Sequence, residues 1–323
     1  MATNLVQLFI FRRLSGSEMK LLTQKEVVRL LVKELVRLSD SNNLEQEVKI
    51  ESKEPVQNQE ETLAENQEEE SSQIVNELGT TLEERYNPPS GFIRIRVQED
   101  GFADFLRKMK LKPYGEKVLY YNGQTKPSEG VYDSVVDVQI GDRDLHQCAD
   151  AIMLLRAEYL YTKQEYDQIS FKFSNGFIAD YQKWMEGYRI HIDGNSFSWS
   201  KQSSFSNEYE SFRKYMNLVF AYAGTATLEK ELDSVSLEDM CIGDVFIKGG
   251  SPGHAIIIVD IAENTLTGEK AFILAQSYMP AQQTQILINP TNQKISPWYI
   301  LDTNNQLRTP EWKFEVSQLK RFP

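Results

Sequence analysis

The spacing of apolar residues predicts one helix near the N-terminus and a mixed set of elements from residue 86 onward. Between Thr23 and Leu38, the apolar residues fall on one helical face and Lys and Arg lie opposite, as in an amphipathic helix. We expect this helix to dock onto a partner or to self-associate. A helix that lies on a membrane surface is the alternative.

From residue 86 the pattern predicts a small mixed start, a helical middle and a β-rich end. Helices are predicted over residues 101–110, 142–163, 177–186 and 209–223. Strands are predicted over residues 92–97, 117–121, 135–140, 245–247, 254–261, 271–276 and 285–288. The segment 187–206 is expected to be irregular and aromatic. This order of elements predicts the α+β fold class.

Composition divides the chain into three parts. No aromatic residue occurs between Ser39 and Arg85, and this stretch is rich in Glu, Gln, Asn and Ser. Such a segment cannot bury enough apolar surface to offset the entropy cost of ordering. We therefore expect an N-terminal segment with its helix over 1–38, an acidic disordered linker over 39–85, and a single α+β domain over 86–323.

Charge and hydropathy exclude several classes of partner. The net charge is −12, and a polyanion repels phosphate backbones, so no nucleic-acid partner is predicted. No apolar run is long enough for a membrane span. The N-terminal apolar stretch is followed, rather than preceded, by basic residues, so no signal peptide is predicted. The expected location is the cytoplasm, with the cell envelope as the alternative if the start is misassigned.

Cys148 is the first candidate for chemistry. It lies within about a turn of the expected start of the 142–163 helix, where Asp142 and Asp144 are good capping residues. The positive end of a helix dipole favours the thiolate, which is the nucleophilic form of cysteine. A small buried core residue is the structural alternative.

His254 and Gln276 are the second and third candidates. A Gly- and Pro-rich loop leads to His254 at the start of a very apolar strand. If the following hairpin turns near Thr265, His254 pairs with a residue close to Gln276, whose amide oxygen can then accept a hydrogen bond from the second ring N–H of His254. A structural histidine and a glutamine that reaches water are the structural alternatives.

Together these residues predict a nucleophile, a base and an orienting group. We expect the Cys148 sulfur to lie about 3 to 5 Å from a ring nitrogen of His254. His146 is a poor base for Cys148, because residues two apart do not face each other on a helix. His146, Cys148 and His191 lack metal-ligand spacing, so neither a metal nor a cofactor is predicted.

Two resemblances support this interpretation. Residues 243–247 (GDVFI) and 253–259 (GHAIIIV) resemble the Gly-Asp-Leu-Val-Phe and His-Val-Gly-Ile-Tyr patterns of NlpC-type peptidases. That likeness implies a papain-like core, in which the helix that carries Cys148 packs on an antiparallel sheet, and a Cys–His–polar triad that cuts bacterial cell-wall peptides. The long Cys148–His254 gap then implies a helical insertion.

The second resemblance covers nearly all of residues 88–322. Residues 144–151 (DLHQCADA), 155–161 (LRAEYLY) and 275–282 (AQSYMPAQ) resemble a bacterial family known as domain of unknown function 4846. It implies no established activity. The competing function is a non-catalytic domain that binds a peptide or glycan through its aromatic middle. Five aromatic residues are expected to be core or groove wall: Trp184, Tyr188, Trp199, Trp298 and Trp312.

Overall fold

A computed structural model describes residues 73–127, 130–301 and 306–323. The predicted helix Thr23–Leu38 and the linker up to residue 72 lie outside these residues. The predicted linker also extended to Arg85, and this boundary is wrong. Helix α4 (Leu82–Arg85) is part of the folded unit, with Leu82 and Arg85 buried and Thr81 as its cap.

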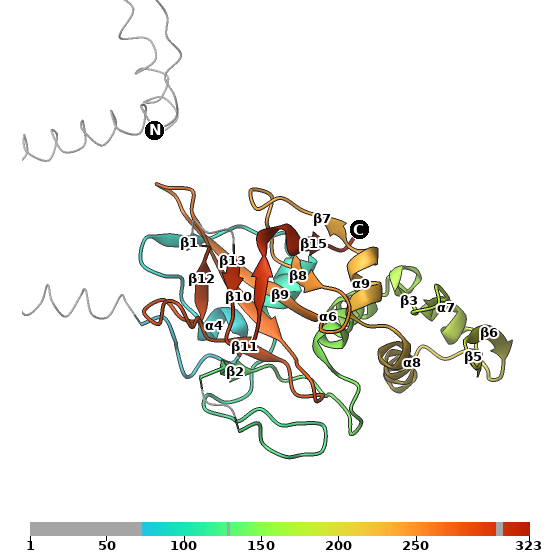
Figure 1. The fold of residues 1–323 in the computed structure, drawn as a ribbon. Coiled ribbons are helices and arrows are strands. Elements are labelled where there is room, and N and C mark those ends of the chain that lie inside the picture. Colours follow the sequence, from blue (N-terminus) through green and yellow to red (C-terminus); the bar gives the residue numbers. More distant parts are fainter. Residues whose placement is uncertain (1–72, 128–129, 302–305) are drawn as a thin grey trace, which may run out of the picture. The chain divides into compact units, whose positions relative to one another are not determined.

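An antiparallel sheet, whose strands differ in length, forms the centre of the fold (Figure 1). Its spatial order is β2 (Tyr132–Val135), β11 (Gln285–Leu287), β10 (Lys270–Gln276), β9 (His254–Asn264), β8 (Val245–Lys248), β15 (Leu319–Arg321) and β7 (Asp233–Ser234). Strand β1 (Phe92–Arg94) also pairs with β9, and β12 (Trp298–Ile300) also pairs with β10. Strand β9 is buried over almost its whole length, which explains its continuous apolar sequence.

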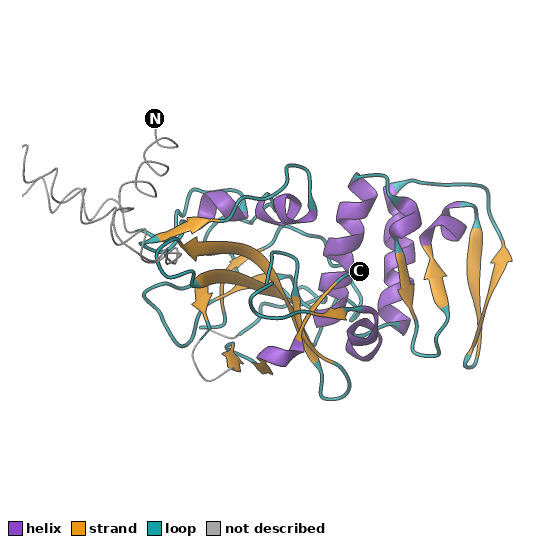
Figure 2. Cartoon of the chain, turned by 90° about the horizontal axis from the view of Figure 1, so that it is seen from above, coloured by secondary structure: helices purple, strands orange, loops and turns teal. Residues whose placement is uncertain are grey.

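Helix α6 (Cys148–Thr162) packs against β9, as does the short helix α5 (Phe102–Arg107). Beyond α6 lie further helices and two small hairpins (Figures 1 and 2). These are η1 (Tyr166–Gln168), β3 (Ser170–Lys172), β4 (Ile178–Asp180), α7 (Tyr181–Met185), β5 (Tyr188–Asp193), β6 (Ser196–Lys201), α8 (Tyr209–Tyr222) and α9 (Thr225–Glu231). Because α6 is covered on most sides, its apolar residues are not confined to one stripe.

The α+β class is confirmed, as are the four β-rich runs of the C-terminal half. Three predicted elements were wrong. Residues 117–121 form only isolated bridges, the strand expected over 135–140 lies at Tyr132–Val135, and 177–186 begins as strand β4 before helix α7. The segment 187–206, which was expected to be irregular, contains the β5–β6 hairpin. The region between Cys148 and His254, which was expected to be helical, therefore contains both helices and hairpins.

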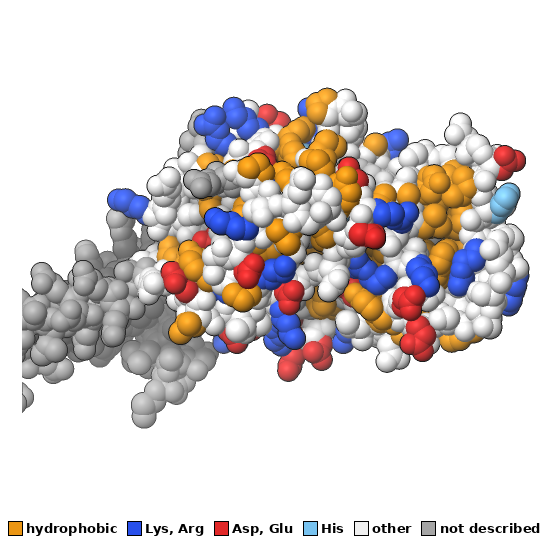
Figure 3. All heavy atoms as spheres, turned by 90° about the horizontal axis from the view of Figure 1, so that it is seen from below, with side chains coloured by type: hydrophobic (Ala, Val, Ile, Leu, Met, Phe, Trp, Pro, Cys, Tyr) orange, Lys and Arg blue, Asp and Glu red, His pale blue; other side chains and the backbone are white. Residues whose placement is uncertain are grey.

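The surface bears on the expected partners. On the face shown in Figure 3, Lys and Arg side chains are interspersed with Asp and Glu, rather than gathered into a basic stripe. Within the part of the chain that the structure describes, no helix combines the length and the apolarity that crossing a membrane requires.

One buried carboxylate joins three elements. Asp260 of β9 has no exposed side-chain surface and pairs with Arg94 of β1 and Arg107 of α5, each at 2.6 Å. Its Oδ1 also accepts the backbone N–H of Ile261 at 2.8 Å. A carboxylate this deeply buried is stable only when it is paired and hydrogen-bonded, so Asp260 fixes β1 and α5 against the middle of β9.

We predict that Asp260→Asn lowers the free energy of unfolding by about 3 to 5 kcal/mol, because two guanidinium groups lose their anionic partner. Glu210→Gln is the matched control. It removes an exposed ion pair with Lys214 and should leave the free energy of unfolding nearly unchanged. Urea titrations followed by circular dichroism measure both values. Equal, small losses in the two variants would contradict the anchoring role.

Candidate functional site

The three predicted residues come from the ends of three elements that pack together. Cys148 is the first residue of α6, His254 is the first residue of β9, and Gln276 is the last residue of β10. Strands β9 and β10 are antiparallel neighbours, so the start of one lies beside the end of the other. Helix α6 packs on β9. The fold therefore brings these chain positions to one region.

His254 and Gln276 are hydrogen-bonded. The imidazole Nε2 lies 2.8 Å from the amide Oε1 of Gln276, and both side chains are about 1% exposed. An amide oxygen only accepts hydrogen bonds, so Nε2 carries the proton and Nδ1 is left as the basic nitrogen. This is the orientation that a general base requires.

The register that produces this contact differs from the expected one. Asp260 pairs with Ile273, but Ile258 pairs with Leu274, so Val259 is an extra residue in β9. Ala275 pairs with Ile257, so one step further along Gln276 lies opposite Ile256 rather than opposite His254. His254 and Gln276 are thus diagonal neighbours on one face, which still allows long side chains to meet.

The start of α6 also differs from the prediction. The helix begins at Cys148 with Gln147 as its cap, and Asp150 accepts the Gln147 N–H at 3.0 Å. Asp144 is not a helix cap. Its carboxylate accepts the Ala281 N–H at 2.6 Å and so holds the loop after β10 against the approach to Cys148.

The Cys148 sulfur faces the peptide that joins His254 to Ala255. The N–H of Ala255 is close enough to lower the pKa of the thiol, as are the N–H groups of Cys148 and Ala149. Burial raises the pKa of Tyr278, and the nearby Glu311 and Cys148 add to this shift. The Tyr278 ring centre lies 4.7 Å from that of His254. A shared neighbourhood of thiol, imidazole and phenol follows from these contacts.

Burial keeps both reactive groups neutral. It raises the pKa of the Cys148 thiol to about 11, which outweighs the three N–H groups that favour the thiolate. It lowers the pKa of His254 to about 4 in spite of the hydrogen bond that the imidazole donates to Gln276. The thiolate expected from the helix dipole is therefore not the form of Cys148 in this structure at neutral pH.

A close backbone approach explains the glycine before His254. A Cβ atom on Gly253 would lie 2.4 Å from the carbonyl oxygen of Gly250 and 2.8 Å from that of Lys248. Any other residue would force this loop away from the strand end. The glycine of the Gly-His pair is thus needed to deliver His254 to the first position of β9.

Aromatic side chains surround His254. The ring centre of Trp312 lies 5.4 Å from that of the imidazole, and the Phe314 ring stacks on it at 5.9 Å. Trp312 had been expected to be core or groove wall, and it is a wall of this site. In the middle of the chain, Phe197 and Trp199 each pack on Phe177.

Two charged residues of the site were not predicted. Gln276 Nε2 donates to Glu311 at 2.6 Å, and Lys126 lies 2.9 Å from the same carboxylate oxygen. Glu311 lies in the turn between β13 (Gln306–Arg308) and β14 (Lys313–Glu315). It is far from Gln276 in sequence and belongs to no motif, so no local pattern could have indicated it.

The other histidine near Cys148 is structural. His146 is fully buried, and its Nε2 lies 3.0 Å from the Thr284 hydroxyl. Burial lowers its pKa to about 3. The hydroxyl of Ser277 donates to the His146 carbonyl at 2.8 Å, so the residues before Cys148 and after Gln276 are joined.

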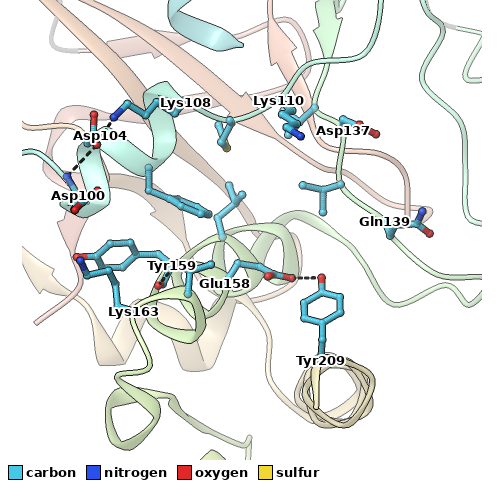
Figure 4. A pocket seen from close by; sticks show the side chains of 16 residues that line it. Asp100, Asp104, Lys108, Lys110, Asp137, Gln139, Glu158, Tyr159, Lys163 and Tyr209 are labelled. Carbon is cyan, nitrogen blue, oxygen red and sulfur yellow. Dashed lines mark hydrogen bonds and ion pairs between the residues drawn. The ribbon is translucent and has the colours of Figure 1, made fainter. Parts of the chain in front are cut away.

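A separate cavity of about 500 Å³ lies along the second half of α6, and none of Cys148, His254 and Gln276 lines it (Figure 4). Its rim contains Glu158, which accepts a hydrogen bond from Tyr209 at 2.6 Å. Burial raises the pKa of Glu158. The three predicted residues therefore lie outside this cavity, in a buried region at the other end of α6.

Cys148 and Cys241 are both free thiols, so the bridge that two cysteines would permit is not formed. Across residues 73–127, 130–301 and 306–323, no cluster of three or more His, Cys, Asp or Glu side chains is arranged to hold a metal ion.

Asp150 gives a testable pH dependence. Burial raises its pKa from 3.8 to about 8, and its Oδ1 has no hydrogen-bond partner among the described residues. The folded protein thus keeps a proton that the unfolded chain loses above pH 4, and Asp150 makes folding less favourable as the pH rises to about 8.

We predict that Asp150→Asn, which mimics the protonated acid, becomes increasingly more stable than the wild type between about pH 4 and pH 8. The difference should reach a few kcal/mol and level off above pH 8. Urea unfolding at several pH values, followed by tryptophan fluorescence, measures it. Parallel stability curves for the two proteins would show that Asp150 titrates normally.

Comparison with known proteins gives one match. The sequence model of the family described as domain of unknown function (4846) matches residues 82–321. Neither the curated proteins nor the solved structures contain a match to this chain. The matched region includes the whole central sheet and α6. It also includes five residues of the site: Lys126, Cys148, His254, Gln276 and Glu311. The chain belongs to the family of the domain of unknown function 4846.

Proposed function

We propose that the domain is a cysteine hydrolase, an amidase or peptidase, in which Cys148 is the nucleophile, His254 the base and Gln276 the orienting group. The observation that carries this proposal is the hydrogen-bonded His254–Gln276 pair beside a thiol at the first residue of α6. A nucleophile, a base and a group that holds the base are the components of a triad.

The reaction starts from a neutral thiol and a neutral imidazole. His254 Nδ1 takes the proton as the sulfur attacks the amide carbon, and later returns it to the leaving amine. The start of α6 supplies backbone N–H groups and a positive dipole end where negative charge develops. Because His254 and Cys148 are nearly buried, the Tyr278 and Trp312 side of the site must open to admit a substrate.

The proposed substrates are cell-wall-type peptides, and the support for this class is the likeness of β8 and β9 to NlpC-type peptidases. Both residues of the shared Gly-Asp pair, Gly243 and Asp244, have structural roles here. Gly243 has φ +97, and a Cβ there would lie 2.9 Å from the Phe102 ring. Asp244 is buried and pairs with Arg321 at 2.6 Å. The likeness therefore supports the papain-like arrangement more directly than it supports the substrate.

A non-catalytic binding domain is the second candidate. The observation that favours it is the burial of both reactive groups, with the thiol pKa raised to about 11. The His254–Gln276 hydrogen bond would then serve to hold the ends of β9 and β10 together. Peptide binding without cleavage by the wild type would support this alternative.

We predict that Cys148→Ser abolishes cleavage of muropeptides, as followed by mass spectrometry, and leaves the fold intact. The substitution keeps nearly the same volume, but a hydroxyl is a far weaker nucleophile than a thiolate at neutral pH. Cys241→Ser is the matched control, since Cys241 contacts Asp244 rather than the site, and should remain active. Full activity of Cys148→Ser would rule out the proposed nucleophile.

We predict a graded loss for the other two residues. His254→Ala removes the base and should lower kcat by about 10²- to 10⁴-fold. Gln276→Ala should lower it less, because Gln276 only orients His254. Steady-state kinetics on the same muropeptides measure both effects. A larger loss in Gln276→Ala than in His254→Ala would contradict these roles.

A further inference from the structure

The β13–β14 hairpin reaches the site through its turn. Thr309 and Trp312 close this turn with a backbone hydrogen bond of 2.9 Å and a bond from the Trp312 N–H to the Thr309 hydroxyl at 3.1 Å. Glu311 is held within it. The turn therefore presents Glu311 to Gln276 and the Trp312 ring to His254 at the same time.

We propose that Glu311, held by Lys126, is a positioning residue that fixes the orientation of the Gln276 amide and thereby selects which nitrogen of His254 is free to act as a base. The proposal rests on the proposed function for its catalytic consequence, but the geometry that it describes can be measured without any reaction.

The first step concerns the amide. A glutamine side chain can be turned end for end, which exchanges its accepting oxygen and its donating nitrogen. Glu311 is an ionised carboxylate and can only accept. The 2.6 Å contact with Glu311 therefore requires the Gln276 nitrogen to point toward Glu311. The amide oxygen must then point toward His254, as it does at 2.8 Å.

The second step concerns the imidazole. Because Gln276 presents only an oxygen, His254 must carry its proton on Nε2 to make the contact. Nδ1 is then deprotonated. If the amide were reversed, its N–H group would favour a proton on Nδ1, and the base would be blocked. Glu311 thus determines, through the orientation of the Gln276 amide, which ring nitrogen of His254 carries the proton.

The third step concerns Lys126. Its side chain is 3% exposed, and its Nζ lies 3.0 and 2.9 Å from the two oxygens of Glu311, which is 21% exposed. A buried ammonium needs such a partner, and the ion pair holds the Glu311 carboxylate in place. Lys126 also lowers the pKa of His254 through its positive charge.

The test is a direct measurement of the His254 tautomer by long-range proton–nitrogen NMR on the full chain. The chain has only three histidines, His146, His191 and His254, so each signal can be assigned by substitution. The wild type should show the Nε2–H form. Glu311→Ala should shift the tautomer ratio toward Nδ1–H by about tenfold, the size expected for one lost hydrogen bond.

Three further variants complete the test. Glu311→Gln retains an accepting oxygen and should restore the Nε2–H form. Glu315→Ala is the matched control, because Glu315 lies on the same hairpin and contacts Gln306 instead of Gln276. Lys126→Met removes the group that holds Glu311, so it should shift the tautomer in the same direction as Glu311→Ala.

An unchanged tautomer in a folded Glu311→Ala protein overturns the proposal. If that variant does not fold, an unchanged tautomer in a folded Lys126→Met protein overturns it instead. Where muropeptides are cleaved, Glu311→Ala should lower kcat with little change in KM, because Glu311 acts on the base through Gln276 and not on the substrate. Failure of the wild type to cleave would remove the proposed hydrolase, while the tautomer result would still decide the role of Glu311.

Discussion

The extra residue in β9 is the constraint on which the site depends. Without Val259 as an unpaired residue, the register that pairs Ile273 with Asp260 would continue and place Gln276 opposite Ile257. Successive residues of a strand point to opposite faces, so Gln276 would then point away from His254. The bulge moves Gln276 onto the correct face. Asp260, directly after Val259, is held by Arg94 and Arg107, so the ion-pair cluster and the bulge occupy the same place.

The site combines the hydrogen-bonded His254–Gln276 pair and the Cys148 thiol with a buried environment. Burial favours the neutral forms of Cys148 and His254, whereas the hydrogen bonds and the start of α6 favour charge separation. In a low-dielectric region each hydrogen bond is strong and each unpaired charge is costly. A reaction that begins from the neutral pair and develops charge only as the substrate binds is consistent with both facts. A purely structural polar cluster would show the same burial, which is why nucleophilicity must be measured.

Local sequence patterns predict much of this fold. Long apolar runs indicate β8 to β11, and apolar spacing indicates α6 and α8, because burial sets those patterns directly. The β5–β6 hairpin could have been predicted as well, since Ile190, Ile192, Phe197 and Trp199 alternate with polar residues around Gly194. The bulge and Glu311 could not. Both depend on partners distant in sequence: Arg94 and Arg107 for the strand, and Gln276 and Lys126 for Glu311.

The central claim is that His254 activates Cys148, and the alkylation rate of that thiol tests it most directly. The protein would carry Cys241→Ser, so that iodoacetamide labels only Cys148. The comparison is with the same protein carrying His254→Asn, which keeps a polar side chain and leaves a smaller void than alanine. The account predicts that labelling at pH 7 slows by about tenfold or more when the base is removed. Equal rates in the two proteins, or a Cys148 that never reacts, would contradict it.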